Sequence, residues 1–233
     1  MKRLLNAVKL DYLLQFRNGF YYAAGVVVLL QVVFLSWLPP ESLDWLLPVV
    51  LLGNILINGF YFIGGLVLLE KAEGSLEAQV VTPLQSHEYL ASKAITLCLL
   101  SLIESLIIVG ILLGADFEVL PLVAGIVLTT AMLCQFGFLI VARYDSINEY
   151  LFPSFVWTLL LSLPLLSYFE VWQSWVFYLH PVQAVLAVLQ AAVLPISAGE
   201  LIYGVLYSTI WVGIAFAFSV QTFYRFVVAK AQP

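Results

Sequence analysis

The sequence predicts an all-α integral membrane protein with six transmembrane helices. Its mean hydropathy is +1.05 and 10% of its 233 residues are charged, whereas about a quarter are charged in an ordinary soluble domain. The apolar residues gather in runs of about 20, the length of a helix that crosses a bilayer. Because these runs and their short connections occupy the chain, we expect a single transmembrane domain over residues 1–233.

The six predicted spans follow one another closely. They are Phe20–Leu38, Trp45–Leu69, Ala91–Leu113, Val119–Val141, Leu151–Tyr168 and Leu201–Tyr224. A further apolar run, Val171–Ile196, is also long enough to cross. Six crossings with both termini in the cytoplasm place every Lys and Arg on the cytoplasmic side, as the positive-inside rule requires, whereas a seventh would move Arg225 and Lys230 outside. We therefore predict a multi-pass protein of the plasma membrane in which residues 171–197 form a broken hairpin, re-entrant or at the outer interface.

Two prolines favour that hairpin. Pro181 and Pro195 each remove a backbone donor, which a helix surrounded by lipid does not readily tolerate. We expect two short helices with a bend near His180 and Pro181, and Trp172 and Trp175 at the outer headgroups. The hairpin is interpreted equally as a protein-covered plug or as an outer gate formed at His180 and Pro181.

The segment before the first span, residues 1–18, has the pattern of an amphipathic helix. Its apolar residues recur at helical spacing, and its basic residues lie elsewhere around the helix. The apolar set is Leu4, Leu5, Val8, Tyr12 and Phe16. We expect this helix to lie along the cytoplasmic membrane surface, where basic residues favour anionic headgroups.

Residues 70–90, between the second and third spans, predict a capped elbow on the cytoplasmic side. Gly74 can end the second span in a left-handed cap, and Ser75 can cap a short helix with Glu77 in its first turn. Thr82, Pro83 and Gln85 then supply a hydroxyl cap, a first-turn proline and a third-position amide that start the third-span helix. A connection needs fewer residues, so this surface is interpreted as a docking site.

The same segment, "EGSLEAQVVTPLQSHEYLASK", resembles the stretch after the second span in permease subunits of type-two ABC exporters, and small drug-export permeases of the fluoroquinolone type are nearest. The matching residues are Glu73, Gly74, Ser75, Leu76, Glu77, Thr82, Pro83 and Lys93. The resemblance covers most of the chain, although the family often has an Arg after the outer proline, where this sequence has Gln183 and Gln190.

The resemblance implies a transport subunit coupled to other chains. Two permease chains, identical or different, would pair in the bilayer, and each would dock a cytoplasmic ABC ATPase that holds ATP and Mg²⁺. The ATPase-coupling residues would be Glu73, Gly74, Ser75, Leu76, Glu77, Thr82 and Pro83. Substitution of Leu76 and Glu77 is expected to abolish ATPase association while the membrane domain stays folded.

The sequence agrees that this chain is not itself an enzyme. It has no G-x-x-x-x-G-K-[ST] phosphate loop, so ATP hydrolysis is expected on a partner. Its two histidines, His87 and His180, lie on opposite sides of the predicted membrane, so no catalytic or metal site can be assembled from them. We expect no cofactor on this chain and no nucleic-acid partner.

Polar residues within the spans are candidates for the substrate pathway. Asn54 and Asn58 are four residues apart in the second span and share a face with Tyr61, where they could line the pathway of a hydrophobic or amphipathic substrate or join helices. Glu104 lies in the middle of the third span, where a charge costs about 2.5–3.5 kcal/mol.

Three readings of Glu104 stay open. It could be protonated and bonded between helices, bind a cationic substrate, or serve as the proton site of an ion-coupled carrier, which is the alternative to an ATP-driven exporter. For the protein as a whole, a third hypothesis beside the exporter and the carrier is a membrane scaffold that transports nothing.

Overall fold

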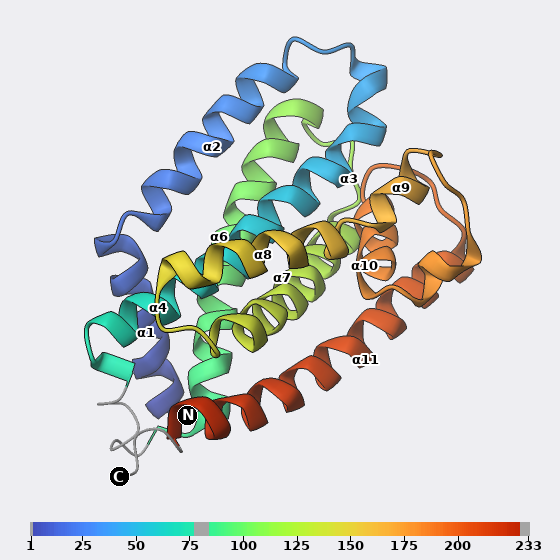
Figure 1. The fold of residues 1–233 in the computed structure, drawn as a ribbon. Helices are drawn as coiled ribbons and strands as arrows, with labels where there is room; N and C mark the ends of the chain where they lie inside the picture. The colour runs from blue at the N-terminus through green and yellow to red at the C-terminus, as the bar shows by residue number, and fades with distance from the viewer. Residues whose placement is uncertain (1, 77–83, 229–233) are drawn as a thin grey trace.

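The structure, a computed structural model, describes residues 2–76 and 84–228, which form helices joined by short connections (Figure 1). The helices are α1 (Lys2–Arg17), α2 (Phe20–Leu35), α3 (Pro40–Leu56), the π-helix η1 (Ile57–Phe62), α4 (Ile63–Ala72), α6 (Ser86–Leu113), α7 (Val119–Val141), α8 (Ile147–Leu161), α9 (Pro164–Tyr168), the 3-10 helix η2 (Trp175–Leu179), α10 (Pro181–Gln190), α11 (Ala198–Phe223) and the π-helix η3 (Tyr224–Val228). These residues contain no strand, which confirms the all-α fold.

Five helical stretches are long and apolar enough to cross a membrane. They are Pro40–Ala72, Ser86–Leu113, Val119–Val141, Ile147–Tyr168 and Ala198–Val227. The predicted first span, Phe20–Leu38, is helical only as far as Leu35, and α2 joins α1 at a bend of 63°. Within the described residues the protein therefore has five spans, or six when the bent pair α1–α2 counts as one. These spans confirm an integral membrane protein.

Helix α7 lies in the middle of the bundle (Figure 1). It contacts α3, η1, α4, α6, α8, α10 and α11. In its apolar window 61% of the residues are buried, against 22% in the span formed by α8 and α9 and 17% in α11. Most residues of the last two spans are therefore at least partly exposed on the outside of the helix bundle.

The second span changes pitch where it crosses α7. Its middle, η1, is a π-helix, which the sequence did not predict and which contains Asn58 and Tyr61. A Cβ atom added to Gly137 of α7 would lie 2.6 Å from the carbonyl oxygen of Phe60 and 3.0 Å from its Cα atom. Only glycine allows α7 to approach η1 this closely.

Helix α1 buries two polar residues and leaves several apolar residues exposed. Asp11 and Gln15 are buried against α6, whereas Leu5, Tyr12 and Phe16 are exposed. Helix α1 packs on α6 through polar contacts, and its position along the cytoplasmic membrane surface stays a prediction. The apolar residues that remain exposed are available to lipid.

We call the end of the bundle where α1 begins and α4 ends the elbow end, and the opposite end the hairpin end. At the elbow end α6 begins at Ser86, with Gln85 as its N-cap and Glu88 completing a capping box. The predicted start at Thr82 and Pro83 was therefore wrong, because Gln85 is the cap itself and Leu84 is not helical.

At the hairpin end, the chain breaks at His180 between η2 and α10. Val182 and residues Ala184–Leu189 of α10 are buried, and α10 packs against α3, α7 and α11. Hydroxyl groups hold the preceding segment in place: Tyr203 and Tyr207 of α11 donate to the backbone oxygens of Tyr178 and Leu179 at 2.6 and 2.8 Å. The bend is where the prolines predicted it.

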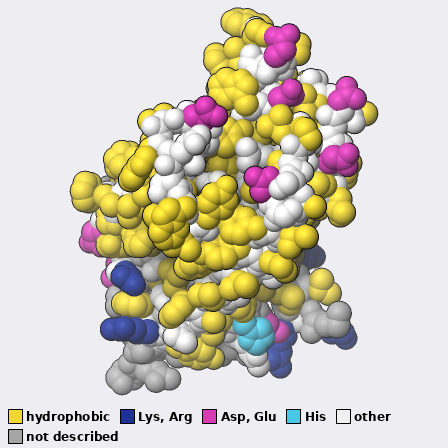
Figure 2. Space-filling view, turned by 90° about the vertical axis from the view of Figure 1, so that its right-hand side faces the viewer, with side chains coloured by type: hydrophobic (Ala, Val, Ile, Leu, Met, Phe, Trp, Pro, Cys, Tyr) yellow, Lys and Arg dark blue, Asp and Glu magenta, His cyan; other side chains and the backbone are white. Residues whose placement is uncertain are grey.

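Charges separate along the bundle. Figure 2 shows one face on which carboxylates gather toward the hairpin end, Lys and Arg lie near the elbow end, and a broad apolar belt separates them. A belt of this kind suits the hydrocarbon core of a bilayer. Which end faces the cytosol stays a prediction.

Candidate transport and coupling sites

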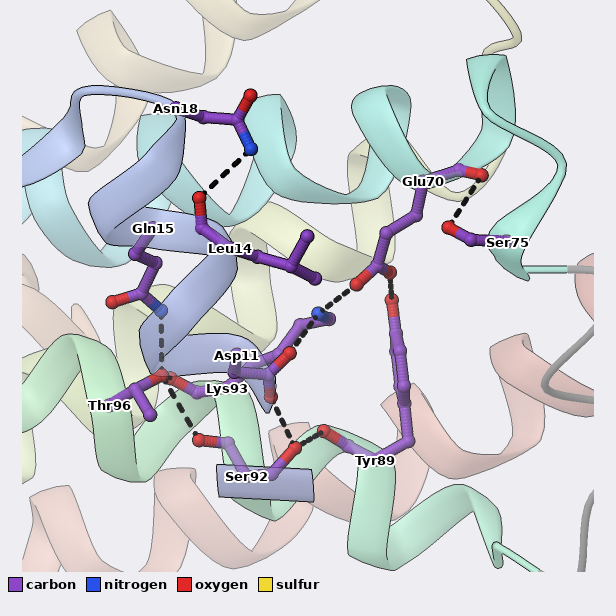
Figure 3. A network of polar contacts seen from close by, with 10 residues as sticks. All are labelled: Asp11, Leu14, Gln15, Asn18, Glu70, Ser75, Tyr89, Ser92, Lys93 and Thr96. Atoms are coloured by element: carbon purple, nitrogen blue, oxygen red, sulfur yellow. Dashed lines mark hydrogen bonds and ion pairs between the residues drawn. The ribbon is translucent and has the colours of Figure 1, made fainter. Parts of the chain in front are cut away.

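A buried ion cluster joins three helices at the elbow end (Figure 3). The side chain of Lys93 in α6 is 0% exposed, and its Nζ lies 2.9 Å from Asp11 Oδ1 of α1 and 2.6 Å from Glu70 Oε1 of α4. A buried charge is tolerated only when it is paired and hydrogen-bonded, so these three helices are held in one arrangement.

Hydroxyl groups complete the cluster. Tyr89 donates to Glu70 Oε2 at 2.6 Å and Ser92 donates to Asp11 Oδ2 at 2.5 Å, so all four carboxylate oxygens have a partner. One turn along, Gln15 of α1 donates to Thr96 of α6 at 2.7 Å. The interface between α1 and α6 is therefore a continuous row of polar contacts.

The elbow leaves α4 directly beside this cluster. Gly74 has a φ of 68°, as the predicted left-handed cap requires, and Ser75 donates to the backbone oxygen of Glu70 at 3.2 Å. Leu76 is 2% exposed and belongs to the main hydrophobic core. Glu73 is exposed and lies 3.6 Å from Arg17 at the end of α1. Leu76 thus attaches the elbow to the hydrophobic core, while Glu73 lies on the exposed surface of the elbow.

Three predicted coupling residues, Glu77, Thr82 and Pro83, lie outside the described residues. Their role, like that of Glu73, Gly74, Ser75 and Leu76, stays a prediction. The burial of Leu76 does change one expectation: its substitution would disturb the core as well as the elbow surface, so it is a poor test of docking alone.

Lys71 connects α4 to the turn between α7 and α8. Its Nζ donates to the backbone oxygens of Ala142 and Tyr144 at 3.0 and 2.6 Å and to Asp145 Oδ1 at 3.3 Å. A cation at the end of α7 also complements the helix dipole there. Through Lys71 and Lys93 together, the end of α4 is bound to α1, α6 and α7.

The polar residues of the second span bond to three different helices. Asn54 exchanges two hydrogen bonds of 2.8 Å with Gln31 of α2, and the hydroxyls of Tyr61 and Thr158 of α8 are 2.7 Å apart. Asn58 bonds toward α6. Because α2 and α6 pack against each other, Asn54 and Asn58 bond toward neighbouring helices, whereas Tyr61 bonds toward α8, so the expectation that all three share one face was wrong for Tyr61. Their contacts match the role of joining helices, and a role in the pathway stays a prediction.

Glu104 lies deep in the bundle with its two oxygens in different surroundings. It is 5% exposed, and Oε2 accepts a hydrogen bond of 2.5 Å from Asn58 Nδ2, which also donates to Ser101. Oε1 is buried and has no hydrogen-bond partner among the described residues. Sequence analysis singled out both residues, and the structure brings them together.

His180 caps the buried helix of the hairpin. Its Nδ1 accepts a hydrogen bond of 3.2 Å from the backbone N–H of Val182, and Pro181 occupies the first turn of α10. Burial lowers the pKa of His180, which favours the neutral ring that this cap requires. This geometry explains why both residues stand at the break. Whether the hairpin is a plug or a gate stays a prediction.

These features can be compared with known proteins. A model of the fluoroquinolones export permease protein family matches residues 2–231. This chain belongs to that family. Two curated relatives, both named fluoroquinolones export permease protein and from two strains of Mycobacterium tuberculosis, are 36% identical over 193 residues, which cover 82% of this chain and 81% of theirs.

The permease is therefore a membrane transport subunit of the drug-export type rather than an enzyme, which confirms the predicted resemblance. Sequence analysis of the permease missed most of the buried cluster. Lys93 was noted only as the end of a motif, and Asp11 and Glu70 were not singled out. One signal was available: Asp11 is the only acid in residues 1–18 and is flanked by apolar residues.

Proposed function

We propose that this permease is the membrane-spanning subunit of an ATP-driven exporter of hydrophobic or amphipathic compounds. Its elbow end would face the cytosol at the plasma membrane and dock a separate ABC ATPase, which holds ATP and Mg²⁺. A second permease chain would complete the pathway. The names of the relatives make fluoroquinolones the first substrates to test.

The observation that carries this proposal is the buried cluster of Asp11, Glu70 and Lys93. A partner that binds the elbow and displaces it moves residues Glu73–Leu76. These residues follow the end of α4 and begin three positions after Glu70. Because Lys93 holds Glu70 to α6 and α1, that motion is passed to three helices rather than absorbed in a flexible loop.

The energy needed supports such a stiff connection. To shift an access equilibrium from 1:99 to 99:1 requires about 5.5 kcal/mol of differential binding. Breaking one buried ion pair by removing a partner costs about 3–5 kcal/mol, and Lys93 makes two such pairs, so separating α4 from α1 and α6 costs free energy of the same order as the shift itself.

The exposed pair of Glu73 and Arg17 provides the test. We expect Glu73→Lys to abolish ATP-driven fluoroquinolone accumulation in inside-out membrane vesicles of a permease-deleted strain that expresses the variant. The charge swap Arg17→Glu with Glu73→Lys restores the ion pair but presents the wrong charge to the ATPase, so it should fail as well. An exposed pair contributes about 0–1 kcal/mol, and the amount of folded permease should not change.

Glu41→Lys, at the hairpin end, is the matched control and should transport normally. Recovery of transport by the charge swap would show that the ion pair alone matters and would contradict docking at Glu73. Accumulation without ATP would overturn the proposed function itself.

A second candidate function, an ion-coupled carrier, is favoured by one observation. Glu104 is buried without a cation within 4 Å among the described residues, and its Oε1 is free to carry a proton. Proton carriers place such groups inside the membrane.

For this carrier, Glu104→Gln should abolish transport driven by a proton gradient. The glutamine keeps an oxygen acceptor for Asn58, so the fold should survive. Uptake in ATP-free vesicles with an imposed pH gradient measures the effect. If wild-type vesicles show no such uptake while ATP drives transport in both proteins, the carrier is excluded.

A further inference from the structure

A groove runs along α7 between the two least buried spans. Helices α8 and α11 both pack against α7 and lie on either side of it (Figure 1). The space between them measures about 520 Å³, within the range of about 300–1,000 Å³ typical of small-molecule sites. It extends from the turn after α7 at Arg143 to His180 and Pro181 of the hairpin.

The walls of the groove are rich in aromatic rings. Phe136, Tyr144, Trp157, Trp211 and Phe218 line it and come from α7, the turn after α7, α8 and α11. They are five of its 13 lining residues, although aromatic residues make up 15% of the chain. The rings of Phe136 and Trp211 meet edge to face with centroids 6.2 Å apart, and Trp157 and Phe218 are 46% and 55% exposed. Such walls match a planar aromatic molecule better than a flexible acyl chain.

One charge stands at the elbow end of the groove. Of the described residues that line it, Arg143 alone carries a permanent charge, and no carboxylate lines it. Arg143 is exposed and has no acidic partner within 4 Å among the described residues. Nearby Asp145 pairs with Lys71 instead. A guanidinium group binds a carboxylate through two parallel hydrogen bonds, so a ligand that is anionic at one end fits here.

We infer that this groove binds planar aromatic compounds that carry a carboxylate, and that Arg143 recognises the carboxylate while the ring lies between Trp157, Trp211 and Phe218. The inference rests on the proposed function, since it supplies the substrate site of the exporter. It also sets the orientation of the substrate, with the carboxylate at the elbow end and the ring toward mid-membrane.

Binding of a fluorescent quinolone carboxylic acid and of its ethyl ester to the purified full-length permease in nanodiscs tests this inference. The acid should bind at least about tenfold more tightly than the ester. Arg143→Gln should remove that preference and leave ester binding unchanged, and Arg143→Lys should keep part of it. Trp157→Leu should weaken both ligands.

Lys9→Gln, which removes an exposed cation of α1 outside the groove, is the matched control and should behave as wild type. Equal binding of acid and ester by the wild type, or an unchanged preference in Arg143→Gln, would overturn the inference. Two other occupants of the groove would also overturn the inference. A phospholipid occupies it if anionic lipid displaces the acid equally from the wild type and from Arg143→Gln. A second copy of the chain occupies it if Leu160→Cys chains cross-link to each other in membranes.

The outcome can be separated from that of the proposed function. Binding is measured without ATP or an ATPase, so a permease that binds the acid as described but transports it without ATP would refute only the proposed coupling. Normal ATP-driven transport by Arg143→Gln, with the preference for the acid retained, would refute only the groove.

Discussion

Lys93→Met is expected to lower the free energy of unfolding by about 3–5 kcal/mol, the largest effect of any single change considered for this permease. The methionine fills the volume of the lysine stem but leaves Asp11 and Glu70 buried without a cation. Their remaining partners are the hydroxyls of Ser92 and Tyr89, which cannot neutralise a charge. Unfolding in an SDS titration, followed by circular dichroism, measures the loss.

Two further variants isolate the cause. Lys9→Met removes an exposed lysine from α1 and should leave the midpoint unchanged. The triple variant Lys93→Met, Asp11→Asn and Glu70→Gln removes all three charges and should regain most of the loss, because neutral amides cost less to bury than unpaired carboxylates. A Lys93→Met protein as stable as wild type would contradict the structural role given to the cluster.

Gly137→Ala should have the second largest effect, a loss of about 1–3 kcal/mol from overpacking. The added methyl group would lie 2.6 Å from the backbone oxygen of Phe60, and the backbone cannot turn aside as a side chain could. Helix α7 must then move away from η1, the segment that also carries Asn58. The same SDS titration measures the change, and Gly137→Leu should be worse.

Gly213→Ala is the matched control for that experiment. Gly213 lies within α11, and a Cβ atom added there meets nothing within 4 Å. Alanine favours helix more than glycine does, so this variant should be as stable as wild type or slightly more so. If Gly137→Ala and Gly213→Ala change the stability equally, then Gly137 is not needed for the close approach of α7 to η1.

The stability predictions bear on transport as well. Lys93, Glu70 and Asp11 connect the elbow to the bundle, so the Lys93→Met and triple variants also probe coupling. A triple variant that is stable but transports poorly would indicate that the charges, and not the fold alone, are needed to pass motion from the elbow to α6.

Local features of the sequence were enough for much of the fold. Hydropathy located five of the six predicted spans, because only an apolar helix of sufficient length can exchange water for lipid around it. Gly74 and Pro181 marked their turns because their backbone restrictions do not depend on neighbours. The family motif around Glu73 and Gly74 was also readable, because it is continuous in the chain.

Only the tertiary structure decided which way each helix faces. Asp11 and Lys93 are 82 residues apart, and nothing local pairs them. In a soluble protein the apolar face of a helix reveals its inner side, but in a bilayer lipid and protein interior are equally apolar, so rotation is set by close packing and polar contacts. For this reason the sequence showed Tyr12 and Phe16 as one face of α1 but could not show that Asp11 and Gln15 are the buried side. The groove beside Arg143 was hidden for the same reason: it exists only because α8 and α11 lie on either side of α7.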